Sequence, residues 1–144
     1  MQNIGQHLKE LREKSGYSQQ KLSQLLGFAK NSYGSYERNN STPPIEKFIK
    51  LAELYHTSVQ YIVTGEAISE TFDEKAVTPF PERLQELRMK SGRKQVELAD
   101  ALHVAEVTYQ RYEYGHFEPK LDKLLTLADL FGVSLDELFG RNQT

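Results

Sequence analysis

The chain has 144 residues, of which 38% are apolar, and a formal net charge of -2. It contains no cysteine, which excludes disulfides, thiolate metal sites and a cysteine nucleophile. No apolar run approaches the roughly 20 residues that cross a bilayer, and residues 1–20 lack the apolar stretch of a signal peptide, so we expect no membrane partner and a cytoplasmic location.

The apolar residues of the first part of the chain are spaced as in short helices. Ile4, Leu8 and Leu11 recur at i, i+4 and i+7, and Gly16 is placed to end this helix in a left-handed conformation. Ser18 can cap a second helix. The remaining helices are expected near residue 30, after the pair Pro43–Pro44 with the prolines in the first turn, and from Ser58.

Residues 66–79 follow with a different composition. They are acidic and lack a strong helical period, so we expect a linker with one helical turn around Ile68 and Phe72. No sustained polar–apolar alternation and no Asn-Gly or Asp-Gly turn is found in the chain, which predicts no strands. The predicted fold class is all-α.

An internal repeat is found when the chain is compared with itself at an offset of 76 residues. The segment Leu8–Arg12 matches Leu84–Arg88, and about one position in three is identical across residues 5–64. Two copies are too few to bury a stacked solenoid core, so we predict two domains of one fold, residues 1–65 and 80–144. Their charges differ, because residues 1–65 carry eight Lys/Arg against five Asp/Glu while residues 81–144 carry nine against eleven.

The stretch from Ser18 to Asn39 resembles the phage-repressor and Cro-like (XRE-type) helix-turn-helix family, and the stretch from Lys94 to Gly115 resembles the same motif. The resemblance implies two tandem five-helix, lambda-repressor-like domains that bind double-stranded DNA. In the first copy, the helix that starts at Gln19 would hold a phosphate. In the next helix, Lys30 can donate to guanine and Asn31 can bond adenine. The residues that the resemblance assigns to DNA in this copy are Gln19, Ala29, Lys30, Asn31, Ser35, Asn39, Asn40 and Ser41.

The second copy departs from this pattern. Glu106 stands where the first copy has Lys30, and phosphates repel a carboxylate unless it accepts from cytosine. His103 stands at the turn glycine, where a positive φ would cost strain. Two alternatives stay open: this copy also reads DNA, or it is a dimerisation or partner module. If it reads DNA, the matching residues are Gln95, Ala105, Glu106, Val107 and Arg111.

Other repeated residues are expected to be structural. Arg12 with Glu37, and Arg88 with Glu113, match a partly buried ion pair of the resembling family. The four histidines are scattered without metal-ligand spacing, so we expect no metal and no cofactor. Repeated tyrosines at i and i+3 are expected in the cores rather than on DNA, and they are Tyr33, Tyr36, Tyr109 and Tyr112.

The leading functional prediction is a sequence-specific DNA-binding transcriptional regulator that represses by occupying a promoter. The alternative is an antitoxin or another protein-interaction module, in which the second domain binds a protein partner. A homodimer is compatible with both. An enzyme with a small-molecule substrate is the weakest prediction, because the sequence contains no recognisable nucleophile–base pair or glycine-rich phosphate loop.

Overall fold

The computed structural model describes residues 3–144 of the chain. The chain divides into two compact units, of which the first ends at Ser69 and the second runs from Glu70 to Thr144. Between residues 3 and 144, no helix combines the length and the apolar character that crossing a membrane requires.

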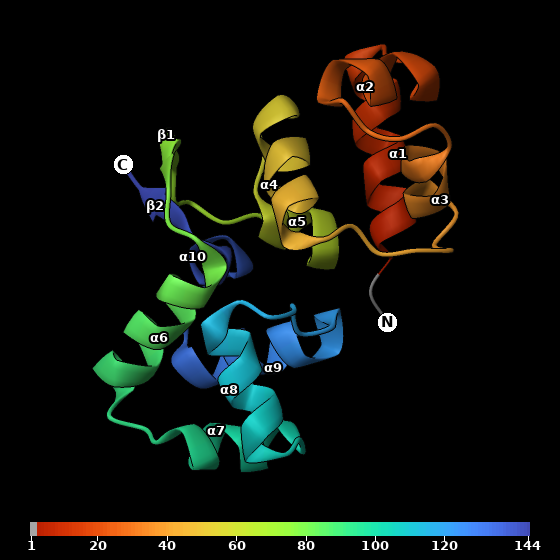
Figure 1. Ribbon diagram of the computed structural model, residues 1–144. Coiled ribbons are helices and arrows are strands. Elements are labelled where there is room, and N and C mark those ends of the chain that lie inside the picture. The colour runs from red at the N-terminus through yellow and green to blue at the C-terminus, as the bar shows by residue number, and fades with distance from the viewer. Residues whose placement is uncertain (1–2) are drawn as a thin grey trace. The chain divides into compact units, whose positions relative to one another are not determined.

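The first unit is built from five helices, shown in Figure 1. Helix α1 packs against α3 and α5, α2 packs against α3, and α4 packs against α5. The helices are α1 (Ile4–Ser15), α2 (Gln19–Leu26), α3 (Ser32–Glu37), α4 (Ile45–Leu54) and α5 (Val59–Thr64). The all-α prediction is therefore confirmed for this unit.

The ends of these helices follow from local side-chain chemistry. Gly16 ends α1 at a φ of 79°, and the Ser18 side chain accepts a hydrogen bond from the backbone N–H of Lys21 at the start of α2. Ser58 caps α5 in the same way. The prediction that Pro43 and Pro44 lie in the first turn of the fourth helix is wrong, because α4 begins at Ile45 and both prolines precede it.

Each unit has its own core, and the repeated tyrosines belong to it. Tyr33 and Tyr109 are fully buried, and Tyr36 and Tyr112 are nearly so. Within each pair the rings meet edge to face, at 6.5 Å between centroids in the first unit and 6.2 Å in the second. The assignment of these tyrosines to the core is confirmed.

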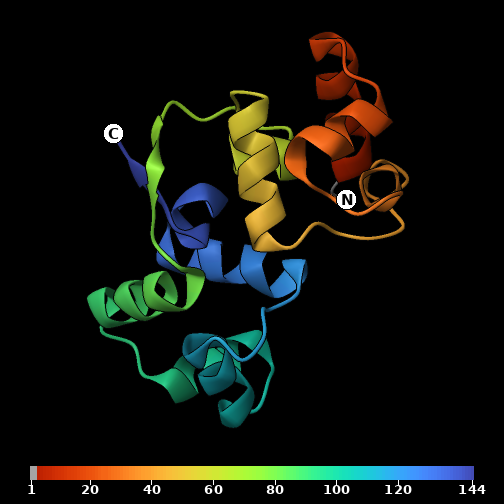
Figure 2. The same ribbon diagram turned by 45° about the horizontal axis from the view of Figure 1, so that its top comes forward.

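The second unit repeats the five helices and adds two strands. The helices are α6 (Phe80–Ser91), α7 (Gln95–Leu102), α8 (Glu106–Tyr114), α9 (Leu121–Phe131) and α10 (Leu135–Phe139). The strands β1 (Phe72–Val77) and β2 (Arg141–Gln143) pair in antiparallel fashion, and both views show them side by side (Figures 1 and 2). The prediction of no strands and the prediction of a helical turn around Ile68 and Phe72 are both wrong.

Buried charge and one glycine fasten this small sheet to the helices of the second unit. The Arg141 guanidinium is paired with the buried Asp136 carboxylate at 2.8 Å and lies over the Phe72 ring. The Thr78 N–H donates to Gly140 O, and a Cβ at residue 140 would lie 1.8 Å from Thr78 O, so only glycine fits there. Phe72 and Arg141, and Thr78 and Gly140, are more than 60 residues apart, which is why a search for local alternation misses the strands.

The start of the first helix meets the end of the third helix in both units, but the residues at this contact differ between the units. In the first unit the Gly5 N–H donates to Asn39 Oδ1 at 2.9 Å, with Asn39 in a left-handed conformation. In the second unit Pro81 stands in place of Gly5 and has no N–H, and Gly115 stands in place of Asn39 and has no side chain. The donor and its acceptor are thus present together or absent together.

Candidate nucleic-acid interface

A groove of about 610 Å³ lies between α2 and α3 of the first unit. The side chains that line it are cationic, amide-bearing or neutral, and none is a carboxylate. They belong to Gln19, Gln20, Ser23, Gln24, Phe28, Lys30, Asn31, Gly34 and Arg38. Such a lining attracts anions and offers hydrogen bonds to neutral polar edges.

Lys30 and Asn31 line this groove from the turn that precedes α3, not from the helix itself. Helix α3 begins at Ser32, and Asn31 has a φ of 69°, so the expectation that Ala29, Lys30 and Asn31 lie in the helix is wrong. In the second unit α8 begins at Glu106, the counterpart of Lys30. Asn31 tolerates the left-handed conformation that delays α3, whereas its β-branched counterpart Val107 disfavours it, and Glu106 is favourable at the positive end of α8.

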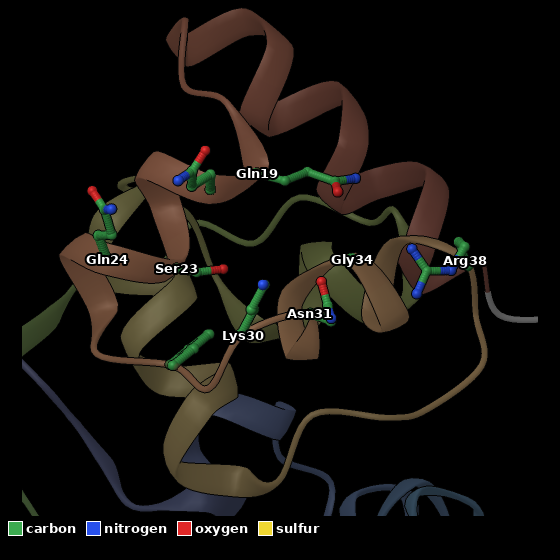
Figure 3. A pocket seen from close by; sticks show the side chains of 9 residues that line it. Gln19, Ser23, Gln24, Lys30, Asn31, Gly34 and Arg38 are labelled. Carbon is green, nitrogen blue, oxygen red and sulfur yellow. The ribbon is translucent and has the colours of Figure 1, made fainter.

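The side chains of Lys30, Asn31 and Ser23 point into the space between the two helices (Figure 3). Lys30 and Asn31 are exposed. The ammonium group and the amide are therefore accessible to a ligand that enters the groove.

The amide of Gln19 is committed within the protein. Gln19 Nε2 donates to Glu37 Oε1 at 3.0 Å, and the same carboxylate accepts from Arg12 Nε at 2.6 Å and from Arg12 Nη2 at 3.1 Å. Burial raises the pKa of the Glu37 carboxyl, but the bonds from Arg12 and Gln19 outweigh burial and hold that pKa below its ordinary value. Gln19 thus connects the groove to a buried ion pair between α1 and α3.

The loop after α3 is also held by internal bonds. Ser35 Oγ lies 2.7 Å from Ser41 Oγ, and the Asn40 N–H donates to Ser35 O. The Asn39 side-chain oxygen is used by Gly5, as described above. Asn39, Asn40 and Ser41 are exposed, so the loop is a pre-formed polar edge beside the groove.

The second unit has the same frame behind a different surface. Arg88 and Glu113 form a matching pair at 2.6 Å and 3.1 Å, and Gln95 Nε2 donates to Glu113 Oε1 at 3.2 Å. His103 lies in the turn before α8 with a φ of 58°, which is the left-handed conformation that costs strain in a residue other than glycine. The remaining positions assigned to this copy, Ala105, Glu106, Val107 and Arg111, are all exposed on or before α8.

Comparison with known proteins agrees with this geometry. The model of the helix-turn-helix family matches residues 8–62 and again residues 84–138, which is more than half of the chain. The chain belongs to the helix-turn-helix family. No solved structure matches the chain significantly.

Several curated helix-turn-helix proteins are similar to parts of the chain. The uncharacterized HTH-type transcriptional regulator YobD of Bacillus subtilis is 41% identical over 58 residues, which are 40% of this chain and 52% of YobD. The HTH-type transcriptional regulator ImmR of the same organism is 30% identical over 87 residues, 60% of this chain and 68% of ImmR. The cryptic phage CTXphi transcriptional repressor RstR of Vibrio cholerae is 35% identical over 60 residues, 42% of this chain and 54% of RstR. The chain thus spans about half the length of YobD and RstR.

Sequence reasoning missed one cation of the first helix-turn-helix motif, Arg38. A Cβ at residue 34 would lie 2.9 Å from Arg38 Nη1 and 3.0 Å from Gln19 Oε1, so Gly34 makes the room in which the guanidinium lies. No local pattern in the sequence marks Arg38, because its position depends on the absence of a side chain at residue 34.

Proposed function

We propose that the chain is a sequence-specific DNA-binding transcriptional regulator, and that the first unit reads duplex DNA through the groove between α2 and α3. The observation that carries this proposal is the grouping of Lys30, Asn31 and Arg38 at one groove without a carboxylate. The two cations supply the charge that phosphates require, and the Asn31 amide supplies a donor and an acceptor for a base edge.

The reading surface needs a rigid support, and the structure supplies one directly behind it. Tyr33 is fully buried on the inner side of α3, and the paired Arg12 and Glu37 join α3 to α1. Because Gln19 bonds the same Glu37 carboxylate, the start of α2 is fixed relative to α3. A preformed surface loses less conformational entropy on binding, which favours affinity and specificity.

We further propose that the chain acts as a repressor in the cytoplasm, by occupying promoter DNA. The similarity to RstR, which is named as a phage transcriptional repressor, supports this role. Binding would be salt-dependent, since each neutralised phosphate releases counterions.

A pair of double variants tests the proposal. The purified chain is used to select its preferred duplex from a random pool, and binding to that duplex is then titrated. Lys30→Ala with Asn31→Ala should weaken specific binding by about 100-fold, because each lost base contact costs about 1–3 kcal/mol. The matched control is Gln85→Ala with Lys90→Ala, which removes an amide and a cation from exposed positions of α6 in the second unit and should leave the selected sequence unchanged.

Both double variants alter only exposed side chains, so their folding is checked by circular dichroism before binding is compared. Selection of the same duplex with unchanged affinity by the Lys30 and Asn31 variant would contradict the proposal. The same holds if the control alone loses specificity, because the reading surface would then lie in the second unit.

A further inference from the structure

The face of the second unit that corresponds to the groove of the first carries side chains of a different kind. Cationic and amide side chains are replaced there by carboxylates and by apolar side chains, while the frame behind them is retained. A surface of this kind repels phosphates. The counterparts are Lys30 and Glu106, Gln24 and Asp100, Arg38 and Tyr114, Asn31 and Val107, and Gln20 and Val96.

The apolar replacements are not covered within the chain. Tyr114 is 65% exposed, Val107 is 52% exposed and Val96 is 41% exposed. Among the described residues of the first unit, Leu25 is the only large apolar side chain that is exposed to a comparable degree. An exposed apolar group that replaces polar residues at a binding surface indicates an interface with protein.

Helix α8 arranges this surface with a definite order. Its inner side is buried, and at about 100° per residue Tyr114 and Val107 lie next to each other on the outer side. Glu106 lies about 80° from Tyr114 on one side and Arg111 about 40° from Val107 on the other, and both are exposed. One helix face therefore carries an apolar centre between an anionic edge and a cationic edge.

We propose that this face of α8 binds the same face of a second copy of the chain and forms a two-fold symmetric dimer. When two such helices lie side by side in the same direction around a two-fold axis, the Glu106 edge of one faces the Arg111 edge of the other. Val107 and Tyr114 of both copies are then buried in the centre, where aromatic anchors contribute most to affinity. Opposite charges at the two edges make the face complementary to itself.

Dimerisation through the second unit would strengthen DNA binding by the first unit. A single module of this size buries only about 600–1,000 Å² on DNA. Two first units joined through their second units would bind two half-sites with a raised effective concentration. The dimer itself is measured without DNA, so its absence would leave the proposed reading surface of the first unit untouched.

Sedimentation of the full chain across the micromolar range tests the apolar centre of the face. The wild-type chain should sediment as a dimer, and Val107→Asn with Tyr114→Arg should raise the dissociation constant at least about tenfold. Both changes replace exposed side chains, and circular dichroism checks that the fold is retained. The matched control is Met89→Lys, since Met89 is also 65% exposed and lies on α6, and this variant should remain dimeric.

Charge reversal tests the edges of the face. Glu106→Arg alone, or Arg111→Glu alone, would place like charges opposite each other and should weaken the dimer, while the two changes combined should restore it. A wild-type chain that sediments as a monomer overturns the proposal, and so does a dimer that none of these variants weakens. If the Val107 and Tyr114 variant loses DNA affinity with no change in sedimentation, the face binds DNA instead, and the proposal is equally wrong.

Discussion

At the scale of single residues, the tyrosine at the centre of each core has a different polar environment. Tyr33 OH donates to Leu8 O at 3.3 Å and lies 3.0 Å from Tyr55 OH. Burial raises the pKa of Tyr55 to about 12 and that of Tyr33 further. In the second unit Phe131 stands in place of Tyr55, and the buried Tyr109 hydroxyl makes no hydrogen bond of normal geometry to any described residue.

Removing the two hydroxyls should therefore have unequal effects. Tyr33→Phe should lower the free energy of unfolding of the first unit by about 1–2 kcal/mol, because it leaves a buried hydroxyl partner without its bond. Tyr109→Phe should change that of the second unit by less than about 0.5 kcal/mol. Urea unfolding followed by NMR signals of each unit measures both values. Equal losses in the two units would show that the Tyr33 bonds contribute nothing.

The sequence identified the residues around the groove more reliably than their roles. Lys30 and Asn31 line it as the family resemblance implies, but Asn39 was expected on DNA and its side-chain oxygen is bonded to Gly5. Its partner lies 34 residues away, so no local pattern shows the bond. Arg38 was overlooked because its guanidinium fits only where residue 34 has no side chain, and the sequence alone does not show that these two residues are in contact.

At the scale of helices, the ion pair between Arg12 and Glu37 links α1 to α3. The Glu37 side chain is only 4% exposed and that of Arg12 15%. Breaking a buried pair by removing one partner costs about 3–5 kcal/mol. The pair was predicted from the family resemblance, and the second copy carries it as Arg88 and Glu113.

The contribution of this pair should be lost in acid. The pKa of Glu37 is lowered by folding, so its stabilisation is complete above the ordinary glutamate pKa of about 4.3 and is lost as the pH falls through the lowered value. At neutral pH, Glu37→Gln should destabilise the first unit by about 3 kcal/mol. Below the lowered pKa the Glu37 carboxyl of the wild-type chain is neutral as well, so the difference in unfolding free energy between the two chains should disappear.

Urea unfolding of the wild-type chain and of Glu37→Gln at neutral and acidic pH, followed by NMR signals from α1 and α3, measures this difference. A gap between the two chains that stays constant as the pH falls would mean that the charge of Glu37 does not hold the helices together.

Element boundaries and the strand pair show where local sequence reasoning ends. Turn glycines and serine caps predicted the ends of α1 and α2 because each acts within a few residues. The late start of α3 follows from the left-handed conformation of Asn31, which the pattern of the repeat does not predict. The pairing of β1 with β2 joins residues about 70 positions apart, such as Phe72 and Gln143, and no local window on the sequence detects it.

At the scale of the whole molecule, one frame carries two surfaces of opposite character. The first unit presents cations and amides, and the second presents carboxylates, valines and a tyrosine at the same positions. The two units share the buried tyrosine pairs and both ion pairs, so the difference between their surfaces lies in the exposed side chains. This division is the basis of the two proposals, that the first unit binds DNA and that the second binds protein.

The most direct test is to follow the backbone amide NMR signals of the full chain while its selected duplex is added. The account predicts that the signals that shift or broaden first belong to the groove of the first unit, at Lys30, Asn31, Gly34 and Arg38, while those of Glu106 to Tyr114 stay in place. Changes centred on α8, or none at the groove at a concentration that saturates the DNA, would contradict it.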